Sequence, residues 1–103
     1  MTEIRYNGEE LRMSVRGHSG YAPVGRDIVC AGVSAVCMVL DRALTGSAEY
    51  KAESKYEKAS AGYEVSCAPS EKMAESCRGI MEAAAWSLER IAAAYPKNVR
   101  YER

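Results

Sequence analysis

The stretch RGHSGYAPVGRDIVCAGVSAV, residues 16–36, joins a glycine-rich segment to an apolar run and contains His18, the only histidine of the chain. Three glycines and one proline between residues 17 and 26 predict a loop, because these residues interrupt helices and strands. From Asp27 to about Ala43 apolar residues recur at helical spacing, and Asp27 is suited to cap the helix. They are Val29, Val33, Val36, Cys37, Leu40 and Leu44. The stretch therefore predicts a loop that enters a helix with one buried face.

Two hairpins and a second helix are predicted around this stretch. Residues 2–16 alternate apolar and polar side chains about Asn7-Gly8, the pair typical of a two-residue hairpin turn. Residues 49–58 alternate similarly, and after Ser60-Ala61-Gly62 the chain returns through Tyr63, Val65 and Cys67 as a second hairpin. Ser70 is suited to cap a second helix that Pro96 stops. Its apolar stripe consists of Met73, Cys77, Ile80, Met81, Ala84, Leu88, Ile91 and Tyr95.

These elements predict the order ββαββα(β), where the last strand is VRYE, residues 99–102. The expected fold is α+β, an α/β sandwich in which two helices pack on a mostly antiparallel sheet of two hairpins and a short C-terminal strand. No linker, repeat or low-complexity tract divides residues 1–103, so a single domain is expected.

Composition narrows the range of partners. Fourteen basic residues balance fourteen acidic ones, so no field of one sign favours nucleic acid, and no direct nucleic-acid partner is expected. MTEIRYNGEE at the start has no apolar segment, and no stretch is expected to approach the roughly 18 apolar residues of a membrane span. We therefore expect a cytoplasmic protein with no membrane partner. The four cysteines are expected to be free thiols, and without a C-x-x-C pair neither a metal nor a cofactor is expected.

Cys30 is the candidate nucleophile. With Asp27 as the N-cap, Cys30 occupies the third helical position, where free N–H groups and the helix dipole favour a thiolate. His18 on the loop is suited to take the thiol proton and later to protonate a leaving amine. The backbone N–H groups of Cys30 and its neighbours are expected to form an oxyanion hole. The alternatives are a buried, inert cysteine and a solvated histidine.

Two neighbours of Cys30 have competing interpretations. Asp27 either orients His18 and steadies the loop or only caps the helix, and the cap is favoured. Ser34 lies one helical turn after Cys30 on the same face. Its hydroxyl is expected to bond to the thiolate or a bound peptide, and the alternative is a bond to the Cys30 carbonyl.

The remaining cysteines and Trp86 are interpreted by their place on the helices. Cys37, Cys67 and Cys77 occupy apolar-stripe positions and are expected to be packing residues, which leaves only Cys30 reactive. Trp86 points away from its stripe, so it takes part in a dimer contact, is covered by a terminal segment, or lies on the alkyl chain of Arg90.

The loop itself is predicted to be a substrate-gated lid. A glycine near each end allows the backbone to swing, while Ala22-Pro23 stiffens its middle. In the free protein the His18 ring is expected to lie beyond hydrogen-bond reach of the Cys30 sulfur. The alternative is a rigid loop whose glycines only satisfy turns. The predicted substrate loop consists of Ser19, Gly20, Tyr21, Ala22, Pro23, Val24 and Gly25.

GHSGYAPVGRDIVCAGVSAV resembles the signature of the ribosomal-processing cysteine protease (Prp) family, which has a G-H pair, a small-residue loop and D-I-V-C-A-x-V-S-A in this order. The resemblance implies a bacterial endopeptidase that removes a short N-terminal extension from a large-subunit ribosomal protein precursor, after an aromatic residue that is usually phenylalanine. It implies Cys30 as nucleophile and His18 as base, with Gly17, Asp27 and Ser34 at positions that the family keeps. It also implies a homodimer with the α/β sandwich fold.

Two other functions are compatible with the pattern. One is a binding module that holds a ribosomal protein tail without cutting it. The other is a redox sensor, which is disfavoured because no resolving cysteine lies near Cys30 in the sequence. A precursor peptide analysed for product masses distinguishes an enzyme from a binder.

Overall fold

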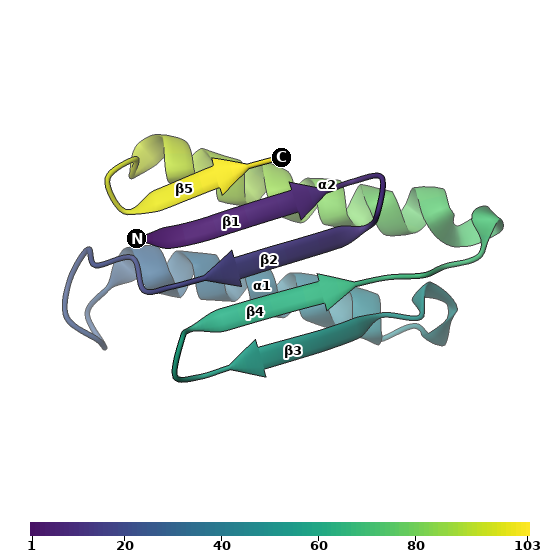
Figure 1. Cartoon of the computed structure of the whole chain (residues 1–103), viewed down its shortest axis with the longest axis horizontal. Coiled ribbons are helices and arrows are strands. Elements are labelled where there is room, and N and C mark those ends of the chain that lie inside the picture. The colour runs from purple at the N-terminus through teal and green to yellow at the C-terminus, as the bar shows by residue number, and fades with distance from the viewer.

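A five-stranded sheet forms one layer of the protein, and two helices lying side by side form the other (Figure 1). The computed structural model describes residues 1–103. Its elements are β1 (Thr2–Asn7), β2 (Arg12–Arg16), α1 (Ile28–Thr45), the short 3-10 helix η1 (Ala48–Tyr50), β3 (Glu53–Glu57), β4 (Gly62–Ser66), α2 (Glu71–Ala94) and β5 (Val99–Glu102). This order confirms the predicted ββαββα(β) arrangement and the α+β fold.

The strands lie in the order β3-β4-β2-β1-β5. Three neighbouring pairs are antiparallel, and β5 joins the edge of β1 in parallel, with Thr2 opposite Val99. This pairing places the start of β1 beside the turn that connects α2 to β5. The loop between β2 and α1 lies at the same end of the molecule (Figure 1). Segments from the beginning, middle and end of the sequence therefore meet there.

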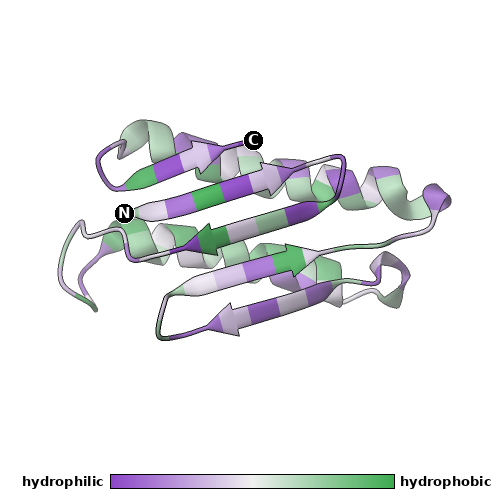
Figure 2. Cartoon of the chain, in the orientation of Figure 1, coloured by the Kyte–Doolittle hydropathy of each residue, from purple (hydrophilic) through white to green (hydrophobic).

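The core lies between the sheet and the helices. Figure 2 shows hydrophobic and hydrophilic bands following one another along the strands, as expected for a sheet with one face covered by helices. Ile4 and Met13 from the sheet, and Leu40 and Leu44 from α1, are at most 2 % exposed. Burying an aliphatic side chain of this size contributes about 1.5–3 kcal/mol. The buried positions of α2 are Cys77, Met81, Ala84, Ala85 and Leu88, which confirms the centre of the predicted stripe.

The first hairpin differs from the prediction in its turn. Asn7 pairs with Arg12, so the connection spans the four residues 8–11 and is not a two-residue Asn-Gly turn. The Asn7 Oδ1 accepts hydrogen bonds from the backbone N–H groups of Glu9 and Glu10, both at 3.0 Å. Leu11 closes the turn with φ of +55° and is buried. The asparagine thus acts through its side chain, which stabilises a longer turn than the pair alone predicts.

The second hairpin begins later than predicted. Residues 48–50 form η1, which ends at Lys51 in the left-handed conformation, so β3 starts at Glu53. All five residues of β3 are exposed, including Tyr56 at 68 %. The alternating apolar and polar side chains of β3 therefore leave both faces of the strand exposed. β3 is an edge strand, and β4 is its only neighbour in the sheet. Ser70 stands at the N-cap of α2, but its side chain makes no capping hydrogen bond.

The helix α1 is more apolar than expected of a segment that does not span a membrane. Its 18 residues have a mean hydropathy of 1.7, enough in length and composition to cross a bilayer, so the expectation that no stretch approaches such a span is wrong. The core helix of a globular domain passes the same test. Val29, Val33 and Cys37 on the inner face of α1 pack into the core beneath the sheet, whereas Ile28, Met38 and Val39 are exposed.

Candidate active site

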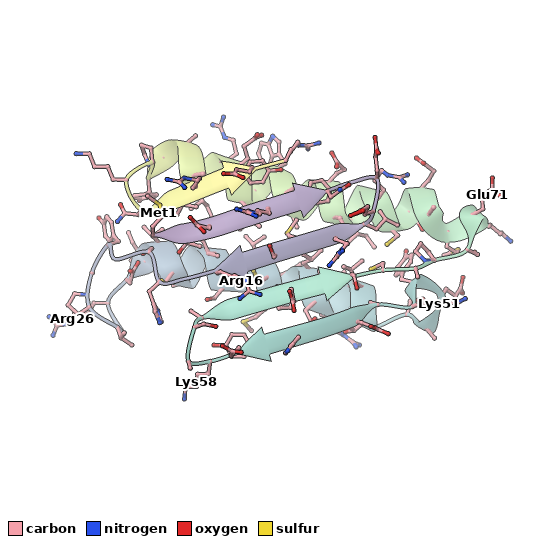
Figure 3. The ribbon with its side chains drawn as sticks, viewed as in Figure 1. Met1, Arg16, Arg26, Lys51, Lys58 and Glu71 are labelled. Atoms are coloured by element: carbon pink, nitrogen blue, oxygen red, sulfur yellow. The ribbon has the colours of Figure 1, made fainter.

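The loop begins where Gly17 crosses the start of β1. Gly17 has φ of +93°, and a Cβ atom there would lie 2.5 Å from the carbonyl oxygen of Met1. The Thr2 hydroxyl donates to the Gly17 carbonyl at 2.9 Å, and the Met1 amino group donates to the His18 carbonyl at 2.8 Å. Only glycine combines this backbone conformation with so close an approach. Figure 3 labels Met1 and Arg26, which lie at this end of the molecule.

Cys30 occupies the third position of α1, as predicted. Asp27 has an extended backbone conformation and caps the helix, since its Oδ1 accepts the N–H of Cys30 at 2.9 Å. The Cys30 side chain is half-buried, whereas the other three cysteines are buried. Val29 and Val33 fix the helix by packing inward on either side of this position. The fold therefore presents one thiol at a helix N-terminus.

Asp27 also organises the loop. Its Oδ2 accepts the Ser19 hydroxyl at 2.5 Å and the backbone N–H groups of Tyr21 and Ala22 at 3.1 and 3.4 Å. Partial desolvation opposes ionisation of the carboxyl, but the bonds from Ser19, Cys30 and Ala22 outweigh it and lower the pKa of Asp27 to about 2. Both the capping and the loop-steadying interpretations are thus confirmed, while the carboxylate makes no hydrogen bond to His18.

The loop brings a backbone donor to the thiol. The N–H of Ser19 lies 3.3 Å from the Cys30 Sγ, an interaction that stabilises a thiolate. His18 is the residue before this donor, yet its ring is exposed and makes no hydrogen bond within the chain. His18 therefore precedes the residue whose N–H contacts the sulfur, but no hydrogen bond connects its imidazole to the Cys30 thiol.

Two of the expected oxyanion donors are already bonded, those of Cys30 and Ala31, whereas donation from the other neighbours of Cys30 stays a prediction. The N–H of Cys30 is already bonded to Asp27 Oδ1, and the N–H of Ala31 is bonded to the Asp27 carbonyl at 3.0 Å. Neither group is free to bind a developing oxyanion. The reason is the cap itself, because an aspartate N-cap uses the donor that an empty helix N-terminus would offer.

The other predicted site residues differ in how they are held. Ser34 is exposed one turn after Cys30, and its hydroxyl is bonded neither to the Cys30 sulfur nor to the Cys30 carbonyl, while its bond to a bound peptide stays a prediction. The substrate loop has an anchored part, residues 19–22, bonded to Asp27, and an outer part, residues 23–26. In the outer part Val24 is 90 % exposed, and the Arg26 N–H donates to the Pro23 carbonyl at 2.9 Å.

No group of three or more His, Cys, Asp or Glu side chains is arranged to hold a metal ion.

Cys37, Cys67 and Cys77 are buried in the core, as predicted. Burial, together with the charge of Asp41, raises the pKa of Cys37 to about 11. Burial and the neighbouring Cys77 raise the pKa of Cys67 to about 12. The thiols of Cys37 and Cys67 therefore stay protonated near neutral pH.

Trp86 is 63 % exposed, and the Arg90 guanidinium lies 5.9 Å from its ring centroid. The side chain of Arg90 thus lies near the ring through its guanidinium, and packing of the ring on the alkyl chain stays a prediction. The dimer contact at Trp86 stays a prediction.

Two contacts to the loop come from residues 95–98, between α2 and β5, for which the sequence predicts no part in the site. The Asn98 Nδ2 donates to the Ser19 carbonyl at 3.0 Å across 79 positions of sequence. The Tyr95 ring meets the Tyr21 ring edge to face, with centroids 5.4 Å apart. Neither residue carries a local signal, because the contacts depend on the parallel pairing of β5 with β1.

A half-buried thiol at a helix N-terminus, contacted by a loop that carries the only histidine, defines a candidate cysteine peptidase site on a small α/β sandwich. The chain belongs to the Cysteine protease Prp family, whose model matches residues 1–100. This membership confirms the resemblance seen in residues 17–36 and extends it to nearly the whole chain.

Solved structures share the fold. The essential ribosomal processing protease Prp from S. aureus, in complex with a covalently linked product peptide, is 24% identical with a TM-score of 0.82, over 99% of this chain and 97% of that chain. The same protease with a substrate peptide is 23% identical with a TM-score of 0.76, over 99% and 97%. SMU.848 from Streptococcus mutans is 23% identical with a TM-score of 0.74, over 98% and 90%. No match was found among curated proteins.

Proposed function

We propose that this protein is a cysteine endopeptidase that removes the N-terminal extension of a large-subunit ribosomal protein precursor in the cytoplasm, for ribosome assembly. The observation that carries the proposal is Cys30, a half-buried thiol at the third position of α1 with the Ser19 N–H 3.3 Å from its sulfur. Family membership supports a cysteine protease. The ribosomal substrate is proposed from the S. aureus relative, which is described as a ribosomal processing protease.

The proposed reaction uses Cys30 and His18 in two steps. His18 takes the thiol proton, and the sulfur attacks the carbonyl carbon of the scissile peptide bond. The tetrahedral intermediate collapses when the carbon–nitrogen bond breaks, and the imidazolium gives its proton to the leaving amine. Water then attacks the thioester as His18 takes its proton, and the acid product leaves as the carbon–sulfur bond breaks and the thiol recovers the proton. No cofactor takes part.

This reaction requires the His18 ring to turn toward Cys30 when a peptide binds, since no hydrogen bond joins them in the free chain. Gly17 and Asp27 support the change by fixing both ends of the anchored loop, through the contacts to Met1 and Ser19. The exposed residues 23–26 and Ser34 are left to contact the peptide, whose residue before the cut is proposed to be aromatic.

The test is a synthetic peptide that covers the precursor's N-terminus, incubated with the purified protein and analysed by mass spectrometry. Wild type is expected to give two products that sum to the substrate plus water. Cys30→Ala and His18→Ala are expected to give none, while Cys67→Ala, which removes a buried thiol, is the matched control and keeps cleavage. Wild type that binds the peptide without cutting it would instead establish the binding module.

A homodimer is proposed as well. The outer face of α1 exposes Ile28, Met38 and Val39 at 60, 71 and 70 %, with Ala31 and Ala35 between them at helical spacing. An uncharged stripe with small residues at its centre suits close packing against a second copy. Sedimentation equilibrium is expected to give twice the chain mass for wild type and the chain mass for Val39→Lys. A wild-type monomer at micromolar concentration would contradict this proposal.

A further inference from the structure

The side-chain amide of Asn98 ties the end of the chain to the loop beside Cys30. Its Nδ2 donates to the Ser19 carbonyl at 3.0 Å. Asn98 itself is fixed through its backbone, because its N–H donates to the Tyr95 carbonyl and its carbonyl accepts the N–H of Thr2, both at 2.9 Å. The amide therefore projects from a backbone held by both α2 and β1.

Ser19 depends on this amide. It is one of only two buried polar residues and is 2 % exposed. Its carbonyl accepts no backbone N–H, so the Asn98 amide is its only partner within the chain. A buried carbonyl without a hydrogen-bond partner is unfavourable, which gives the segment a preference for the position that meets the amide.

The same residue carries the donor to the nucleophile. The N–H of Ser19 lies 3.3 Å from the Cys30 Sγ, while its hydroxyl is bonded to Asp27 Oδ2. The Ser19 N–H shares its peptide group with the His18 carbonyl, which accepts a hydrogen bond from the Met1 amino group at 2.8 Å. Together with the bonded Ser19 carbonyl and hydroxyl, this holds the peptide groups on both sides of Ser19 with the N–H toward the sulfur. Without the amide, the second of these peptide groups loses its partner, and the N–H is held less firmly against the thiolate.

We propose that Asn98 is a positioning residue for the nucleophile: by holding the Ser19 carbonyl, its amide aims the Ser19 N–H at the Cys30 sulfur and stabilises the thiolate. The inference rests on the proposed function, in which Cys30 is the nucleophile. It assigns a part of the site to a residue 68 positions beyond Cys30, outside the stretch that carries the family signature.

The experiment compares wild type with Asn98→Ala and Asn98→Leu. The leucine keeps the shape of the side chain and removes the donor without adding a charge beside the thiol. Lys97→Ala, an exposed neighbour in the same turn, is the matched control. Two readouts are needed: kcat and KM on the precursor peptide, and the rate of Cys30 alkylation by iodoacetamide from pH 5 to 10. The other titratable groups about the thiol are Asp27, His18, the Met1 amino group, Tyr21 and Tyr95, and all are unchanged in these variants.

Both Asn98 variants are expected to lose about tenfold in kcat with little change in KM, and their alkylation midpoint is expected to rise by about one pH unit, the effect of one hydrogen bond to a charged group. Lys97→Ala is expected to match wild type. An unchanged midpoint with unchanged kcat overturns the proposal, as does loss of the fold in both variants, which would make Asn98 purely structural. If wild type cleaves nothing, the proposed function fails, while alkylation still tests the link from Asn98 to the thiol.

Discussion

Gly17→Ala is expected to displace the loop between β2 and α1 and to destabilise the protein. A Cβ at residue 17 would lie 2.5 Å from the Met1 carbonyl oxygen, a distance that must grow to at least 3.0 Å, so the two backbones must separate by about half an ångström. That movement weakens two hydrogen bonds of Gly17, from the Thr2 hydroxyl at 2.9 Å and to the Ser60 carbonyl at 3.2 Å.

The cost is the sum of two effects. A non-glycine residue at this positive φ costs about 1–3 kcal/mol, and losing two hydrogen bonds costs about 0.5–1.5 kcal/mol each. Gly17→Ala is therefore expected to lower the free energy of unfolding by about 2–6 kcal/mol, a large part of the 5–15 kcal/mol typical of a domain.

Gly20→Ala separates the two effects. Gly20 has φ of +72°, but a Cβ there would meet nothing within 4 Å, so only the conformational strain is expected. The measurement is urea and thermal unfolding of both variants, with peptide cleavage measured below their melting temperatures. Gly17→Ala is expected to melt at least about 4 °C below Gly20→Ala and to lose more activity. Equal melting temperatures would refute the argument that the Met1 carbonyl excludes a side chain at residue 17.

Three further outcomes are expected. Because the pKa of Asp27 is lowered from 3.8 to about 2, the stability that its carboxylate contributes is present above about pH 4 and is lost as the pH falls toward 2. Urea unfolding should show the gap between wild type and Asp27→Asn closing over that window, and a constant gap contradicts the hydrogen bonds to the carboxylate. Limiting iodoacetamide at pH 7 should label Cys30 before Cys37 and Cys67, whose pKa values are raised to about 11 and 12; peptide mapping that finds either core thiol first refutes the assignment. In hydrogen exchange on Cys30→Ala, a non-cleavable peptide should protect residues 23–26 more than residues 19–22, and protection of the whole loop without peptide would rule out a lid.

The local chemistry of the site was readable in the sequence because it depends on neighbours along the chain. Asp27 and Cys30 are three residues apart, so helical geometry alone sets the cap and the position of the thiol. The two helices were predictable for the same reason, since the 3.6-residue period of Val29, Val33 and Cys37 records which face is buried. The family signature lies within the same contiguous segment.

Only the tertiary structure decided how that segment is held. The Asn7-Gly8 pair predicts a two-residue turn in the first hairpin. The turn is instead four residues long, and its length is set by the hydrogen bonds that the Asn7 side chain accepts from the backbone of Glu9 and Glu10. The closeness of Gly17 to Met1 and the bond from Asn98 to Ser19 are likewise absent from any periodic pattern. A pattern records which face of an element is buried, whereas these contacts join residues 16 and 79 positions apart, and the second forms because β5 pairs in parallel with β1. The sequence by itself thus determined the helix, its cap and its thiol, and the pairing of distant strands decided which groups fix the loop against that thiol.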